Sequence, residues 1–138
     1  MLSDNDREVF ATLADIIIPA WNRMPSASAV GVHLQLLDAV LNARPDLTPG
    51  VTRAIGYFTG KEPSAALNGL YREDREAFDA FTLAATGGYY MADRVRAALG
   101  YPGQEAPPYN PFETPDYLTD GSLERVTRRG AIYRSTPR

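Results

Sequence analysis

The sequence predicts an all-α protein, a small bundle of about five helices followed by a long, extended C-terminal tail rich in proline and aromatic residues. Up to Leu99, apolar residues recur three and four positions apart, which is the period of amphipathic helices. No alternating run is long enough to require a β-sheet. Beyond Leu99, five prolines fall within fourteen residues. We therefore expect a helical domain over residues 1–100 and a partner-binding tail over residues 101–138.

Composition limits the classes of function. The chain has 138 residues, 44% of them apolar, which suits one domain with a small core. A formal charge of -3 gives no general attraction to nucleic acid or to an anionic membrane. The charge is uneven, because residues 123–138 hold five arginines against one glutamate. The absence of cysteine excludes disulfides, thiolate metal sites and thiol nucleophiles.

The first apolar run is too short and too interrupted to act as a membrane span or a signal peptide. Asp15 and Pro19 break it, and the residues before it are acidic rather than basic. As the sequence stands we expect a cytoplasmic protein, or a periplasmic one if a leader has been removed.

The first two helices have clear start and stop signals. Ser3 is a suitable N-cap for a helix that Pro19 ends, with an apolar face formed by Val9, Phe10, Leu13, Ile16 and Ile17. A loop with the single tryptophan, Trp21, follows. A second helix ends before Pro45, and its apolar stripe is Val32, Leu36, Leu37, Val40 and Leu41.

Three further helical segments follow before a short final helix. Thr48 is expected to cap a third helix, in which Pro49 takes the first position; its apolar face is Val51, Ala54, Ile55 and Phe58, and Gly60 should end it. Residues 63–70 can form a short helical turn. A longer helix is expected over residues 73–85, with Ala77, Phe78, Phe81 and Ala84 facing inward.

The glycine pair at residues 87–88 is expected to break or kink this long helix, with Tyr89 or Tyr90 in the core. The short final helix should bury Met91, Val95, Ala98 and Leu99 and end at Gly100, where a left-handed cap is wanted before Pro102.

Motifs that carry chemistry are missing from the sequence. A metal site needs three or four convergent ligands, yet the chain has one histidine and scattered carboxylates. We expect His33 to be a surface or boundary residue of the second helix. The glycine pair lacks the preceding strand and the lysine of a phosphate-binding loop. We therefore predict no catalytic, cofactor-binding or metal-binding residue in this chain.

The tail is the feature that an isolated helical domain explains least well. A solvated proline linker rarely carries large aromatic side chains at this density. Aromatic and arginine side chains are the residues that dominate interfaces. The predicted partner-binding residues are Tyr101, Tyr109, Phe112, Tyr117, Arg128, Arg129 and Arg134. The alternative is a tail that folds back over its own helices, with its arginines paired to the acidic core.

Two segments carry a resemblance to a known family. One is the run LADIIIP at residues 13–19, followed by a loop and a helix that opens with AVGV at residues 29–32. The other is GYY at residues 88–90, leading to ALGYPG at residues 98–103. Together they resemble the small subunit, called subunit 3 or gamma, of gluconate 2-dehydrogenase-type enzymes, over about residues 3 to 103.

The resemblance implies a noncatalytic helical partner for a large flavoprotein of the glucose-methanol-choline (GMC) class. The large subunit would hold FAD and oxidise a sugar, glycoside, aldonic acid or related alcohol, and the small one would support its folding and stability. The chain departs from exported members of that family, which often begin with a twin-arginine signal. Its own arginine pair, Arg128 and Arg129, lies at the opposite end.

Two other hypotheses remain open at this point. One is a self-contained small enzyme or ligand-binding domain with a pocket near Trp21, His33 and Tyr90, and it predicts activity or ligand binding by the purified chain alone. The other is a free-standing adaptor that uses its tail to bind an unrelated protein.

Overall fold

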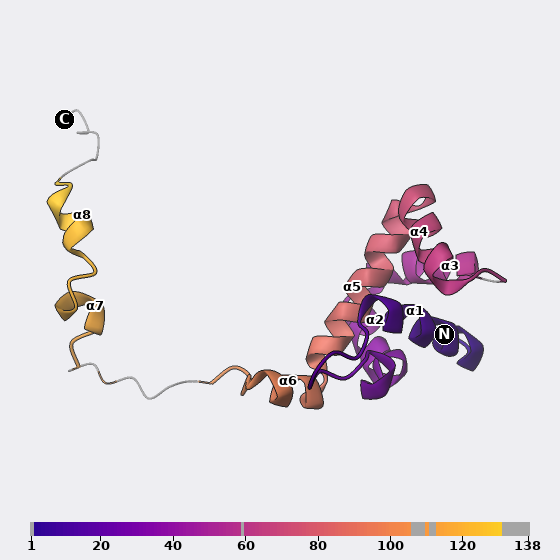
Figure 1. The fold of residues 1–138 in the computed structure, drawn as a ribbon, viewed down its shortest axis with the longest axis horizontal. Helices are drawn as coiled ribbons and strands as arrows, with labels where there is room; N and C mark the ends of the chain where they lie inside the picture. Colours follow the sequence, from indigo (N-terminus) through magenta and orange to yellow (C-terminus); the bar gives the residue numbers. More distant parts are fainter. Residues whose placement is uncertain (1, 59, 106–109, 111–112, 131–138) are drawn as a thin grey trace. The chain divides into compact units, whose positions relative to one another are not determined.

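The structure, a computed structural model, describes residues 2–58, 60–105, 110 and 113–130 (Figure 1). The described residues form helices and one isolated antiparallel bridge between Trp21 and Met24, with no strand. This confirms the predicted all-α class. The chain divides into two units, Met1–Gly103 and Gln104–Arg138. Helices α1 to α6 belong to the first unit, and α7 and α8 to the second, so there are more helices than the five expected.

Helix α1 (Asp4–Ile17) begins and ends as its sequence predicts. Ser3 has an extended backbone, and its hydroxyl accepts a hydrogen bond from the Asp6 amide at 3.2 Å. The Asp6 carboxylate in turn accepts from the Ser3 amide at 2.9 Å, which completes a capping box and lowers the pKa of Asp6. The face turned to the core carries Phe10, Leu13 and Ala14.

The prediction of the second helix is wrong for its first half. A 3₁₀ turn (η1, Ser28–Val30) and an irregular π-type segment (η2, Val32–Leu36) precede a shorter helix α2 (Leu37–Ala43). The backbone at Leu34 is not helical, with φ -101° and ψ -126°. Arg7 of α1 accounts for the kink, because its guanidinium donates to the carbonyl oxygens of His33 at 3.0 Å and Leu34 at 3.2 Å. The apolar periodicity of the sequence could not predict this contact between α1 and η2.

A 3₁₀ turn (η3, Pro45–Leu47) leads directly into α3 (Thr48–Phe58). Thr48 has helical backbone angles, so it is the first residue of the helix and not its N-cap as predicted. Val51, Ala54 and Ile55 are buried on the expected face.

Helix α4 (Pro63–Glu73) has eleven residues and is longer than the predicted turn. The reason is a cap that the sequence analysis did not identify: the Glu62 carboxylate accepts from the amides of Ser64 and Ala65.

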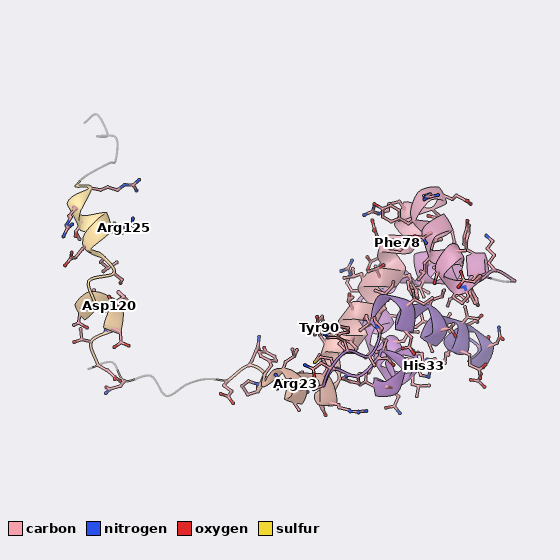
Figure 2. All side chains as sticks on the ribbon, viewed as in Figure 1. Arg23, His33, Phe78, Tyr90, Asp120 and Arg125 are labelled. Atoms are coloured by element: carbon pink, nitrogen blue, oxygen red, sulfur yellow. The ribbon has the colours of Figure 1, made fainter. Side chains whose placement is uncertain are left out.

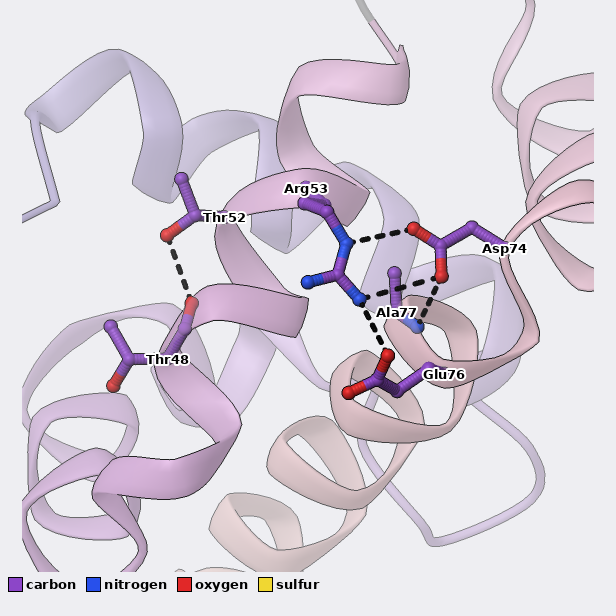
Figure 3. A network of polar contacts seen from close by, with 6 residues as sticks. All are labelled: Thr48, Thr52, Arg53, Asp74, Glu76 and Ala77. Carbon is purple, nitrogen blue, oxygen red and sulfur yellow. Dashed lines mark hydrogen bonds and ion pairs between the residues drawn. The ribbon is translucent and has the colours of Figure 1, made fainter.

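Helix α5 (Arg75–Met91) lies at the centre of the first unit. Among the described helices, α3 has the most extensive contact with it. At their closest approach a Cβ on Gly50 would lie 2.5 Å from the Ala80 Cβ. A polar network joins the same two helices (Figure 3). Arg53 donates to Asp74 at 2.8 Å and to Glu76 at 3.2 Å, while Asp74 caps α5 by accepting from the Ala77 amide. Arg53, and then the Ala77 amide, lower the pKa of Asp74.

The glycine pair neither breaks nor kinks α5, contrary to the prediction, because the helix continues through both residues to Met91. A Cβ on Gly88 would lie 3.0 Å from Val32 Cγ1. Glycine at this position therefore allows η2 to pack closely against α5. The chain leaves α5 at Ala92, whose ψ of 127° is extended, and starts α6 (Asp93–Leu99).

Helix α6 buries fewer side chains than predicted. Only Val95 is buried in this helix, with Ala92 just before it, whereas Met91 and Leu99 are exposed and Ala98 is half-buried. Gly100 adopts the expected left-handed cap, with φ 68°. Of the two tyrosines, Tyr89 is the buried one.

The core of the first unit surrounds an edge-to-face pair of rings, Phe10 and Phe81, whose centroids lie 4.8 Å apart. The largest fully buried side chains are Phe10, Phe81, Leu13, Leu37, Leu70, Val32, Val51 and Val95. All of them belong to residues 1–103. The described part of the second unit contributes no buried residue, so the core formed by the described residues lies in the first unit.

Candidate partner-binding surfaces

The second unit contains two very short helices, α7 (Asp116–Thr119) and α8 (Glu124–Arg128). Local hydrogen bonds define the turn between them. Asp120 accepts from the Ser122 amide at 2.8 Å, which lowers the pKa of Asp120, and the Ser122 hydroxyl donates to the Tyr117 carbonyl at 3.2 Å. Helices of four and five residues gain too little from their own hydrogen bonds to persist alone in water. Their order therefore needs a surface to pack on.

The apolar side chains of these helices are uncovered. Tyr117 is 54% exposed and Val126 is 63% exposed, and Leu118 and Leu123 are exposed as well. All the residues of this unit that the structure describes are exposed. An uncovered apolar group loses the stabilisation that burial would give, about 25 cal/mol for each Å².

The predicted partner-binding residues divide into three groups. Tyr117, Arg128 and Arg129 lie on or next to the two short helices and are exposed. Tyr101 belongs to the first unit, where its amide donates to the Arg96 carbonyl at 2.9 Å and its ring is exposed. The others, Tyr109, Phe112 and Arg134, lie outside the described residues. The structure therefore places four of the seven, and all four are accessible.

Arg128 is paired within its own helix. It lies 2.9 Å from Glu124, four residues earlier, and both side chains are largely exposed. An exposed pair of this kind contributes about 0.3–0.5 kcal/mol. A carboxylate on a partner protein can therefore replace Glu124 at little cost. Arg129 follows as the residue that ends α8.

The sequence analysis did not identify a second accessible surface, which lies on the first unit. It centres on the loop after α1, where Trp21 and Met24 exchange two backbone hydrogen bonds of 3.0 and 2.9 Å around a tight turn. Asn22 adopts the positive φ, 52°, that the turn requires. Trp21 is 80% exposed. The only signal for this in the sequence was a single tryptophan in a loop bounded by prolines.

The loop is held firmly although its tryptophan is not buried. Asp15 of α1 accepts from the amide and the hydroxyl of Ser28, at 2.7 and 2.5 Å. The buried Tyr89 hydroxyl donates to the Pro25 carbonyl at 2.7 Å, and burial raises the pKa of Tyr89. These contacts connect the C-terminal end of the loop to α1 and α5, and the Ala27 amide donates to the Ile18 carbonyl at 3.1 Å across its base. Trp21 therefore projects from an ordered support.

Several open hollows lie elsewhere on the first unit. The largest described, about 820 Å³, lies between α1, α2 and α3, and its ionisable lining residues are Asp6, Arg7 and Asp38. All three are already engaged: Asp6 in the capping box, and Arg7 with Asp38 at 2.7 Å and with the kink carbonyls.

None of the hollows described in the first unit is lined by Trp21, His33 or Tyr90, the three residues of the hypothetical ligand pocket. Trp21 and Tyr90 are exposed, and His33 is half-buried in η2, with no hydrogen-bond partner for its Nδ1 among the described residues. Within the same described ranges, no three histidine or carboxylate side chains are grouped so that they could hold a metal ion. No helix in that part of the chain has the length and apolar composition of a membrane span.

The fold and these surfaces define an all-α chain with two sets of accessible aromatic and arginine side chains. Comparison of the chain with protein-family models, with curated proteins and with solved structures found no match in any of the three.

Proposed function

We propose that this chain is a noncatalytic small subunit that binds and stabilises an FAD-dependent oxidoreductase of the GMC class. The partner would oxidise a sugar, glycoside, aldonic acid or related alcohol, and FAD would be bound by the partner. The identity of the partner rests on the sequence resemblance at residues 13–19, 29–32, 88–90 and 98–103. The compartment we propose is the cytoplasm, or the periplasm if a leader precedes this sequence.

One observation supports a partner-binding role above the others. The second unit has two short helices whose apolar side chains, among them Tyr117, Leu118 and Val126, are exposed. A segment that becomes helical on a partner and buries such residues there gains the free energy that it lacks alone. The accessible arginines add charge-assisted hydrogen bonds to carboxylates of the partner.

The test is to purify the full-length chain with an affinity tag from its native host, run it on a sizing column and record the visible spectrum. The proposal expects a species much larger than the 15.1 kDa of the chain, with flavin absorbance and a second chain several times its mass. A colourless monomer would contradict it.

Substitutions in the tail make this test specific. The triple variant Tyr117→Ala, Leu118→Ala and Val126→Ala should carry about a tenth or less of the wild-type flavin, because loss of interface anchors of this size costs 2 kcal/mol or more. Gln104→Ala, at an exposed polar position of the same unit, is the matched control and should retain the wild-type flavin content. Equal flavin in the triple variant and the wild type would show that the tail does not carry the interaction.

A further inference from the structure

The charges of the second unit are separated along its sequence. Its five acidic residues all lie at or before Glu124, and its five arginines all lie at or after Arg125. Within the described part of this unit, an ion pair of 2.9 Å joins Arg128 to Glu124, whereas Asp120, Arg125 and Arg129 form none. An acidic half and a basic half therefore meet here, with unpaired charges on both sides of the junction.

Two exposed apolar side chains lie at the same junction. The Val126 amide donates to the Leu123 carbonyl at 3.0 Å, and the Arg129 amide donates to the Val126 carbonyl at 3.2 Å. Residues joined by such bonds between positions three apart lie one above the other on the same side of a helix. Leu123 is 38% exposed and Val126 is 63% exposed. Figure 2 shows Asp120 at the end of α7, just before this stripe, and Arg125 on α8.

This order of charged and apolar residues is complementary to itself. A twofold interface between two copies pairs each residue with its counterpart in both directions. When two copies of the segment lie antiparallel, with the axis between residues 124 and 125, three kinds of pair face each other across it: Leu123 with Val126, Asp120 with Arg129, and Glu124 with Arg125. A parallel arrangement would place like charges opposite each other, which is unfavourable. Charge complementarity therefore identifies an antiparallel second copy as the occupant of this apolar stripe.

We propose that residues 120–129 are a self-association site, through which two copies of the chain pair antiparallel. The second copy covers Leu123 and Val126 and supplies the surface that helices as short as α7 and α8 need. This inference does not depend on the proposed function. Both kinds of binding use Val126, so self-association and binding of the flavoprotein exclude each other, and the pairing covers the tail while the chain is free.

The test is sedimentation equilibrium of the purified full-length chain over a range of concentrations. The mass of the wild type should rise with concentration from 15.1 kDa toward twice that value. The double variant Arg125→Glu, Arg129→Glu leaves only negative charges in the facing pairs, and Asp120→Arg, Glu124→Arg leaves only positive ones. Each should raise the dissociation constant by about tenfold or more. Arg72→Glu is the matched control for charge, since Arg72 is exposed on α4 of the first unit, and should associate as the wild type does.

An equimolar mixture of the two charge variants separates pairing between copies from an effect within one chain. In the mixture a negative segment faces a positive one, so the mass should return to that of the wild type. The variant Leu123→Ala, Val126→Ala keeps every charge and should also associate more weakly than the wild type.

Three results would overturn the inference: a wild type that keeps the mass of a single chain at every concentration, charge variants that associate as the wild type does, and a mixture that does not recover association. The flavin content of the chain from its native host tests the proposed function separately. A dimer without flavin would support this inference and contradict the proposed function, and a flavin-bearing complex whose free small subunit stays monomeric would do the reverse.

Discussion

Gly50 and Gly56 lie six residues apart in α3, yet a methyl group added to each would meet different surroundings. At Gly50 the new Cβ would lie 2.5 Å from Ala80 Cβ, and neither atom can rotate away because both are fixed to helical backbone. Gly50→Ala should therefore force α3 and α5 apart and cost about 1–3 kcal/mol of unfolding free energy. The measurement is urea denaturation followed by circular dichroism.

Gly56→Ala is the control for this prediction. Gly56 is exposed, and nothing lies within 4 Å of its added Cβ. The substitution should stabilise the protein by about 0.4–1 kcal/mol, because alanine loses less backbone entropy on folding. Equal effects of the two substitutions would contradict the close packing of α3 on α5.

Residue-level signals in the sequence were reliable where the interaction is local. The N-cap Ser3 and the left-handed Gly100 depend on residues within a few positions, so their pattern could be recognised. The glycine pair could not be interpreted in the same way. A glycine that ends a helix and a glycine that lets Val32 approach it, as at Gly88, are identical in the sequence. Only the position of the neighbouring element distinguishes them.

At the scale of elements, the junction between α3 and α5 predicts a dependence of stability on pH. Arg53 and the Ala77 amide lower the pKa of Asp74 below its usual value of 3.8. The charged carboxylate therefore stabilises the folded state above about pH 4, and this contribution is lost as the pH falls through the lowered pKa.

Asp74→Asn tests this contribution. Its melting temperature should be below that of the wild type at pH 7, and the difference should diminish as the pH falls below about 4 and the wild-type carboxyl becomes protonated as well. Thermal unfolding at a series of pH values makes the comparison. A difference that stays constant with pH would show that Asp74 acts through its shape and backbone cap, and not through its charge.

The elements that the sequence placed least well are those decided by tertiary contacts. Apolar periodicity found α1, α3 and α5, whose buried faces repeat regularly. It could not find the break at Leu34, because Arg7, which donates to the carbonyls there, is 27 residues away in the sequence. It also overestimated the buried face of α6, since periodicity shows which residues share a face but not whether another element covers that face.

For the whole molecule, the change of composition after Leu99 corresponds to a physical difference. The described residues up to Gly103 hold the core, and those beyond contribute nothing buried to it. The sequence could predict Tyr117, Arg128 and Arg129 as accessible because prolines and turn residues surround them. It could not predict the exposure of Trp21, because an apolar residue in a loop is as compatible with burial as with exposure until the loop contacts are known.

Truncation after Gly103 tests whether the tail contributes to the fold of the helical unit. If the tail acts only on a partner, the shortened chain should keep a cooperative thermal transition, with a melting temperature within about 4 °C of the full chain, which is the shift expected for less than 1 kcal/mol in a domain of this size. A larger drop, or loss of cooperativity, would support the alternative in which the tail covers its own helices. If the truncated chain keeps its stability but carries no flavoprotein, the tail provides the binding and the helical unit provides the scaffold that presents it.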